Sequence, residues 1–164
     1  MNKLDLAETT TDPVILDELS RDENWLVRLE VARNPNTSPK TLDYLSKDES
    51  WSVRYQVAGN PNTTPETLDY MSRDEGFGIR RNVASNSNAS QETLDYMSRD
   101  EDTCVRCSIV YNSNTTSETL KEMAKVENDS YIKYRIKIHP NCSEETWKYL
   151  SALKLLESLP KVST

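Results

Sequence analysis

Glycine, histidine and cysteine are scarce in this chain of 164 residues, which holds three glycines, one histidine and three cysteines. So few glycines leave no room for a glycine-rich phosphate loop, and so few histidines and cysteines offer little for a metal site. No segment approaches the ~18 consecutive apolar residues that a membrane-spanning helix needs. The acidic start of the chain lacks the basic and apolar regions of a secretory signal. We therefore expect a cytoplasmic protein with reduced cysteines, no cofactor and no membrane contact.

Hydrophobic residues are also few, at 35% of the sequence, while charged residues of both signs make up 29%. This apolar fraction is low for one compact core, yet the mixture of charges differs from that of a plain disordered chain. Acidic residues outnumber basic residues by 27 to 20, which gives a net charge of −7. This negative net charge disfavours sequence-independent binding to nucleic acid or to anionic lipid.

The chain is rich in one feature, an internal repeat with a period of 26 residues. The phrase Asn-Pro-Asn-Thr at residues 34–37 returns in close variants at 60–63, 86–89 and 112–115. A fifth copy follows 27 residues later, at 139–142, so we expect one inserted residue near positions 128–130. We predict a single repeat domain over residues 1–164, with units at about 9–34, 35–60, 61–86, 87–112 and 113–139 and a C-terminal capping helix at 140–160.

Each unit predicts two short helices. Ser38 and Thr64 stand where a side chain can cap free backbone N–H groups, and a proline follows each of them at the first helical position. The second helix begins near Trp51 and ends at the Asn-Pro-Asn turn, because proline disfavours helix in the residue before it. One such hairpin cannot bury its apolar stripe alone, whereas stacked copies can, so the repeat predicts an all-α solenoid.

One unit carries a distinctive pattern of leucine, aspartate, arginine and Asn-Pro residues. The pattern comprises Leu42, Leu45, Ser46, Asp48, Val53, Arg54, Val57, Ala58, Asn60, Pro61 and Thr63. It resembles the unit of the variant leucine-rich repeat family, and the resemblance covers about residues 11–151. It implies a right-handed superhelix of stacked helix pairs, in which one helix of each pair is α or 3₁₀. HEAT-type helical repeats have a similar shape, and the sequence does not distinguish between the two families. Some family members hold an iron–sulfur cluster on a cysteine-rich N-terminal segment, which does not carry over because no cysteine precedes Cys104.

Positions that stay constant between copies are expected to serve the stacking of units. Val53 and Val57 belong to β-branched rows on one face of the second helix, and Leu42 and Leu45 belong to matching rows on the first helix. We predict that these rows form the core. The Asn34 row is expected to cap turns through bonds from side chain to backbone.

Two charged rows repeat in step with each other. The basic row comprises Arg28, Arg54, Arg80, Arg106 and Lys133, and the acidic row comprises Asp22, Asp48, Asp74 and Asp100. We predict that Arg–Asp pairs tie adjacent units together, with a looser tie at Lys133 because lysine lacks the bidentate geometry of arginine. A phosphate-binding track is the alternative interpretation of the arginines.

Positions that vary between copies lie on the opposite face of the second helix and form our candidate binding surface. Solenoids commonly bind partners along such a surface, and tyrosine is enriched at interfaces. The candidate partner-binding residues are Leu26, Leu29, Tyr55, Arg81, Tyr111, Tyr131 and Tyr134. The leading hypothesis is a non-catalytic scaffold that binds a protein or peptide there. The alternatives are a nucleic-acid-binding repeat protein that uses Arg33, Arg81 and Arg135, a domain without a partner of its own, and variable positions that simply face solvent.

Catalytic and metal chemistry is not predicted. Cys104 and Cys107 form a C-x-x-C pair, but two cysteines three residues apart in a helix are poorly placed for a disulfide. His139 occupies the asparagine position of its unit, so we expect it to take over the structural role of that asparagine. A metal site would have only Cys142 and His139 to spare. We therefore predict no enzyme, no catalytic residues and no metal.

The remaining patterns concern the outer face and the C-terminal end. Tyr44, Tyr70 and Tyr96 recur unchanged on the outside of the first helix, and we expect them to pack over the neighbouring unit. A stripe near the end of the chain predicts an amphipathic helix that caps the array. Its members are Trp147, Leu150, Leu153, Leu155, Leu156 and Leu159. A dimer seam is the alternative, so we expect a monomer or a weak dimer through this helix.

Overall fold

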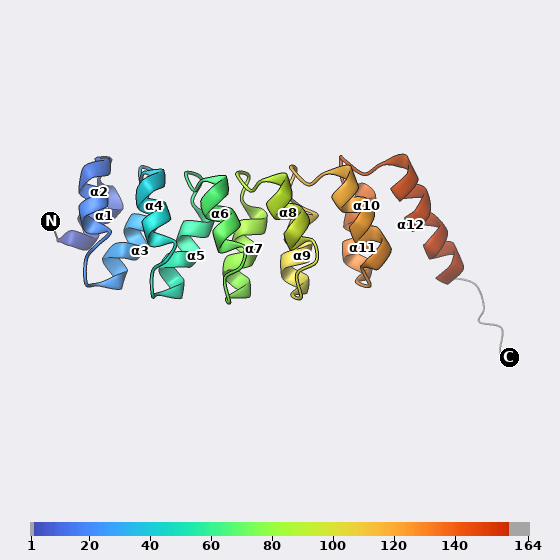
Figure 1. Cartoon of the computed structure of the whole chain (residues 1–164), viewed down its shortest axis with the longest axis horizontal. Helices are drawn as coiled ribbons and strands as arrows, with labels where there is room; N and C mark the ends of the chain where they lie inside the picture. The colour runs from blue at the N-terminus through green and yellow to red at the C-terminus, as the bar shows by residue number, and fades with distance from the viewer. Residues whose placement is uncertain (1, 158–164) are drawn as a thin grey trace.

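The chain forms an elongated row of short helices that follow one another in sequence order from the N-terminal to the C-terminal end (Figure 1). This structure, a computed structural model, describes residues 2–157, with side chains as far as Leu153. Within that range every regular element is an α-helix, so neither helix of a pair is 3₁₀. None of these helices combines the length and the apolar character that a bilayer crossing requires.

The helices alternate between two kinds, which we call first and second helices. The first helices are α2 (Pro13–Leu19), α4 (Pro39–Leu45), α6 (Pro65–Met71), α8 (Gln91–Met97), α10 (Ser117–Val126) and α12 (Glu144–Glu157). The second helices are α3 (Trp25–Arg33), α5 (Trp51–Gly59), α7 (Phe77–Ser85), α9 (Thr103–Ile109) and α11 (Ser130–Ile138). They are preceded by α1 (Lys3–Thr9), which packs on α3 as a truncated second helix.

Local sequence explains where the first helices begin. The side chain of Ser38 accepts a hydrogen bond from the backbone N–H of Thr41, and Thr64 accepts the equivalent bond from Thr67. Each of these residues satisfies a backbone donor that has no partner inside the helix. Proline occupies the first helical position after both, as predicted.

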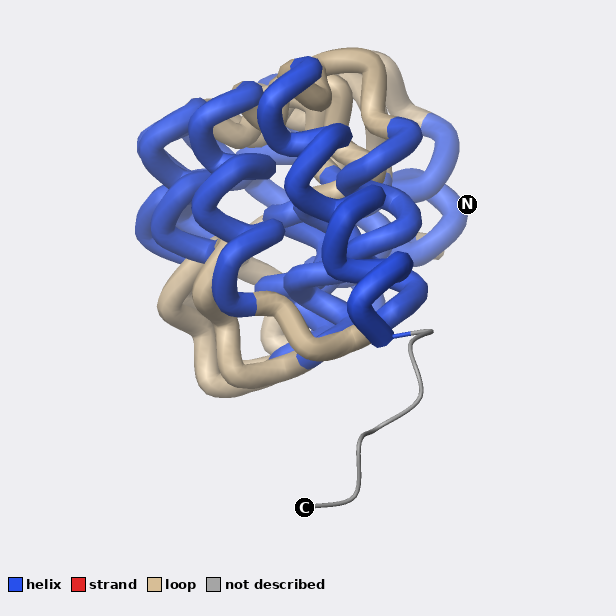
Figure 2. Tube along the Cα trace, turned by 90° about the vertical axis from the view of Figure 1, so that its right-hand side faces the viewer, coloured by secondary structure: helices blue, strands red, loops and turns tan. Residues whose placement is uncertain are grey.

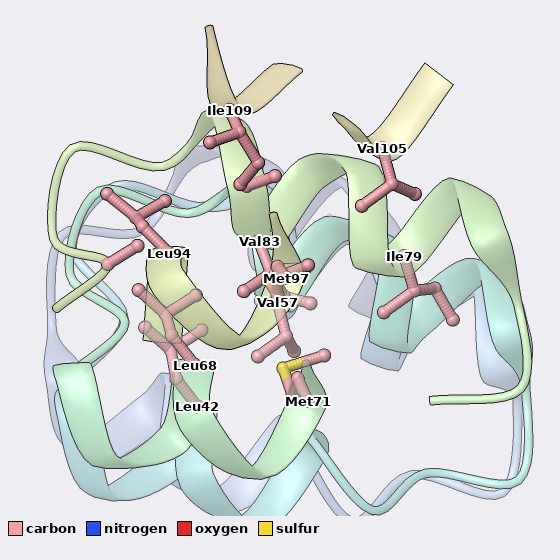
Figure 3. Close-up of a cluster of buried hydrophobic side chains, with 14 of the residues drawn as sticks. Leu42, Val57, Leu68, Met71, Ile79, Val83, Leu94, Met97, Val105 and Ile109 are labelled. Carbon is pink, nitrogen blue, oxygen red and sulfur yellow. The ribbon is translucent and has the colours of Figure 1, made fainter. Parts of the chain in front are cut away.

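Stacking of equivalent residues builds the core. Leu42, Leu68 and Leu94 lie one above another, beside a row formed by Val57 and Val83 (Figure 3). All of these side chains are fully buried, so the apolar rows predicted as core are confirmed. Seen from the C-terminal end, the helices of successive units overlap and the connecting loops gather at the edges (Figure 2). Burial along a row of units replaces the single central core that the composition disfavours.

Successive second helices pack directly against one another from α1 to α9. The same close packing does not continue from α9 to α11. The inserted residue lies at this step, but we placed it too late, at 128–130. It is accommodated at the end of α10, which has 10 residues where α8 has 7. Glu127 therefore stands where Asp100 stands one unit earlier, and Asp129 caps α11 as Asp102 caps α9.

The helix α12 takes the place of a sixth first helix. Ser143 caps Thr146 as Ser90 caps Thr93, and Leu150 is buried in the position of a core residue. Its role as a cap or as a dimer seam remains a prediction. Residues 158–160 of the predicted capping helix, with Leu159, lie outside the described residues, as do the side chains of Leu155 and Leu156.

Candidate interaction surface

The predicted Arg–Asp pairs form a ladder between units. Arg54 Nε donates to Asp74 Oδ2 of the next unit at 2.7 Å, while its Nη1 donates to the Asp48 carbonyl of its own unit at 2.8 Å. Arg28, Arg80 and Arg106 bond in the same way with Asp48, Asp100 and Glu127. The prediction of ties between units is confirmed, and the arginines are not a free phosphate track. Among the residues that the structure describes, no carboxylate lies within ion-pairing distance of Lys133.

The ladder also shifts the ionisation of its acids. Burial raises the pKa of Glu127, but the hydrogen bond from Arg106 and the backbone N–H groups of Asp129 and Asn128 outweigh it, so the pKa lies below its usual value. The pKa of Asp100 is lowered in the same way, with burial opposed mainly by Arg80. Both carboxylates are therefore held in the charged form that the guanidinium groups require.

The asparagine row forms a second ladder between units. Asn60 Nδ2 donates to the carbonyls of Ala32 and Asn34 at 2.7 and 3.1 Å, and its Oδ1 accepts from the Asn62 N–H at 2.9 Å. His139 reproduces this arrangement with its ring. Its Nε2 lies 3.2 Å from the Asn112 carbonyl, and its Nδ1 accepts from the Asn141 N–H at 3.0 Å. The structural role that the sequence assigned to this histidine is confirmed.

Tyrosines on the first helices pack against cations of the preceding unit. The guanidinium of Arg21 lies 4.9 Å from the ring centre of Tyr44, and that of Arg73 lies 4.8 Å from the ring centre of Tyr96. Lys47 lies over Tyr70 at 5.7 Å. The prediction that these uniform tyrosines pack over a neighbouring unit is confirmed. Constant positions thus serve the stacking, which leaves the variable face of the second helices.

The candidate residues on that face fall into two groups. Leu26, Leu29, Tyr55 and Arg81 lie on α3, α5 and α7, which pack side by side. Leu26 is 41% exposed and Arg81 is exposed. Leu29 and Tyr55 are only half-buried and pack against the core, although we placed their row on the side away from it. The reason is the direct packing of second helices, which covers one edge of that row.

The surroundings of Tyr55 show how the packing of second helices buries part of this row. The Tyr55 ring meets Trp51 edge to face, with ring centres 6.4 Å apart, and a Cβ added at Gly78 of the next unit would lie 3.8 Å from it. On the same helix, a Cβ added at Gly59 would lie 3.3 Å from the Asn82 amide. Small residues therefore let adjacent second helices approach, and larger side chains fill the space beside them.

The second group gathers where the close packing ends. Tyr111, Tyr131 and Tyr134 are 53%, 51% and 57% exposed. The hydroxyl groups of Tyr111 and Tyr131 are in hydrogen-bond contact, and the guanidinium of Arg135 lies 4.0 Å from the Tyr111 ring centre. Tyr134 lines a groove between α11 and α12 together with Ile138, Leu150, Leu153, Ser130, Lys133 and Lys137.

Sequence reasoning missed one row of exposed aromatic residues. Trp25, Trp51 and Phe77 are the first residues of α3, α5 and α7, and they are 43%, 66% and 55% exposed. The signal was present in the sequence, because each of the three follows an Asp-Glu-x triplet at the repeat spacing.

The cysteines are free in the described residues. Cys104 is exposed, and burial raises the pKa of the half-buried Cys107 thiol, helped by Cys104 and Asp129. A raised pKa is the opposite of what activates a nucleophilic cysteine. In the part of the chain that the structure covers, no three His, Cys, Asp or Glu side chains gather as a metal site would need.

Comparison with known proteins supports the repeat class. No family model and no curated protein matches the chain. Among solved structures, it is similar to one described as "a leucine-rich repeat variant with a novel repetitive protein structural motif", with 26% sequence identity and a TM-score of 0.67. The match covers 83% of this chain and 54% of the other, so the chain spans about half the length of that structure. The resemblance seen in the sequence is confirmed: within the described residues the chain is an all-helical repeat solenoid, and its fold is similar to that of a leucine-rich repeat variant.

Proposed function

We propose that the chain is a non-catalytic helical-repeat scaffold that binds a protein or peptide along the variable face of its second helices. The observation that carries the proposal is the difference between constant and variable positions. Constant polar and aromatic residues such as Arg54, Asn60 and Tyr96 are engaged in contacts between units. Leu26 and Tyr134 on the variable face stay largely exposed.

The physical basis of the proposal is the cost of exposed apolar surface. Exposed large apolar side chains that line up along one face mark an interaction site, because a ligand that covers them removes their apolar area from water. From α3 to α9 the second helices form a tightly packed layer, so little conformational freedom is lost there when a partner binds. Tyrosine adds apolar area together with a hydrogen-bonding tip, which suits an interface anchor.

A displayed library of random peptides, selected on the intact chain, tests the proposal. Ligands should lose about tenfold or more of their affinity on a Leu26→Ser or a Tyr131→Ser/Tyr134→Ser variant. The matched control is Tyr70→Ser, which removes a tyrosine of similar exposure (55%) from the first-helix face and should leave binding unchanged.

Two results would contradict this function. One is a set of ligands whose affinity depends on Tyr70 and not on Leu26, Tyr131 or Tyr134. The other is salt-dependent binding of DNA or RNA that disappears in an Arg81→Glu variant, which would favour the nucleic-acid alternative.

A further inference from the structure

The row of exposed aromatic residues Trp25, Trp51 and Phe77 is the starting point, and we call it the aromatic row. Its members occupy equivalent positions in three successive units, so their rings form a line along one edge of the second-helix layer. Trp51 is the most exposed of the three, at 66%. Trp51 packs edge to face on Tyr55 of its own helix, yet all three large rings stay exposed at positions that only need to start a helix.

A row of negative charge runs beside the aromatic row. Glu23, Glu49 and Glu75 each precede an aromatic residue by two positions, and all three are exposed. Arg28 contacts both Asp48 and Glu49, so two carboxylates share one guanidinium and one negative charge remains at each step. The Glu49 and Glu75 side chains are 87% and 94% exposed, so their carboxylates are accessible to a partner, although Glu49 lies 3.3 Å from Arg28 Nη2 and Glu75 lies 3.9 Å from Arg54 Nη2.

Five other exposed rings among the described residues have a cation over them. Tyr44, Tyr70, Tyr96, Tyr111 and Trp147 each have a lysine or arginine over the ring, at 4.0–5.7 Å from the ring centre. No lysine or arginine among the described side chains lies over a ring of the aromatic row. Among the described side chains, the rings of the aromatic row are therefore open to a cation from outside the chain, as are the exposed rings of Tyr131, Tyr134 and Tyr149.

The repeat spacing limits the shape of that partner. Packed helices lie about 8–10 Å apart, so neighbouring rings of the row are separated by about that distance. A polyproline II segment rises about 3.1 Å per residue with three residues per turn, so side chains every third residue lie ~9 Å apart on one side. Such a segment meets the successive rings in register.

We propose that the aromatic row binds an extended, basic peptide segment with an arginine or lysine at every third residue. Each cation would lie over Trp25, Trp51 or Phe77 and face the glutamate that precedes the ring. The charge is complementary, because the row is acidic and the chain as a whole carries −7. This inference rests on the proposed function, since it names the partner for the N-terminal part of the same second-helix layer.

Fluorescence titration of the intact chain with a peptide of Arg-Pro-Pro triplets tests the proposal. Tryptophan emission should change on binding, and Trp51→Ala should weaken the affinity by about tenfold. A Glu49→Gln/Glu75→Gln variant should weaken binding to a similar extent and reduce its dependence on salt. Tyr96→Ala is the matched control, because its 51% exposed ring is already covered by Arg73, and it should bind like the wild type.

Each outcome decides the proposal. Binding that survives Trp51→Ala, or equal binding of a peptide of Glu-Pro-Pro triplets, would overturn it, as would no binding of the arginine peptide at all. If library ligands bind through Tyr131 and Tyr134 while the arginine peptide does not bind, the proposed function stands and the basic partner is wrong. Circular dichroism of each variant shows whether the fold is kept.

Discussion

At the scale of single residues, the repeat is held together by polar side chains that bond across the boundary between units. Thr63 Oγ1 donates to the Val57 carbonyl at 2.5 Å, and Asn62 Nδ2 donates to the Pro35 carbonyl of the preceding unit at 2.6 Å. These bonds satisfy backbone groups that would otherwise be buried without a partner. They also explain why the Asn-Thr pair recurs at residues 36–37, 62–63 and 114–115.

His139 offers a direct test of this principle. His139→Asn should leave stability within about 0.5 kcal/mol of the wild type, because an asparagine amide makes the same two bonds in four other units. His139→Ala should cost about 1–3 kcal/mol, since it leaves the Asn112 carbonyl and the Asn141 N–H without partners. Chemical unfolding of the three proteins measures the difference. Equal losses in both variants would show that the ring packs and does not bond.

The sequence predicted the contacts of Arg54 and Asn60 because both residues recur at every step, and a recurring polar residue in a solenoid has the same neighbours in each unit. It did not predict that Tyr55 is half-buried, because that depends on Gly78 of the next unit and on how closely two helices approach. Trp51 was missed for a related reason. The start of this helix near Trp51 was predicted correctly, but the exposure of the ring depends on how closely neighbouring helices pack, which the pattern does not give.

At the scale of elements, the ladder of arginine–carboxylate pairs joins each second helix to the turn that follows the next first helix. At the last step Glu127 replaces aspartate and follows a first helix of 10 residues, where α8 has 7. The longer side chain lets Arg106 keep its pair despite the inserted residue. One substitution thus compensates for a change in the length of a helix.

The buried pair predicts that acid weakens this step. The pKa of Glu127 is lowered on folding from its usual 4.5, so its stabilising contribution is present above that pH and is lost as the pH falls below it. Unfolding by urea at about pH 7 and about pH 3 should show a loss of stability that is smaller in Glu127→Gln. Glu101→Gln, which removes a carboxylate that is 90% exposed, should keep the dependence of the wild type. An equal loss of stability between the two pH values in all three proteins would contradict this account.

At the scale of the whole molecule, stability in a solenoid is a sum over units and over the contacts between neighbours. Four second helices after α1 form one continuous layer, and the layer is interrupted between α9 and α11. Tyr111, Tyr131 and Arg135 occupy that step, where the earlier units have small or polar residues such as Ser85 and Gly78. The chain therefore consists of a tightly coupled N-terminal part and a C-terminal part joined to it by fewer contacts.

Native-state hydrogen exchange should reveal this division. We expect amides of α10 and α11 to open together and to exchange at least about tenfold faster than amides of α3, because fewer contacts must break to free them. The comparison with α3 matters, since it also lies near one end of the array and controls for fraying. Glu127→Gln should speed exchange in α11 and leave exchange in α5 unchanged. It weakens the pair between Arg106 and Glu127, which lies at the step between α9 and α11 alone. Protection of α11 equal to that of α3 would instead show that the contacts among Tyr111, Tyr131 and Arg135 couple the two parts as firmly as direct helix packing does.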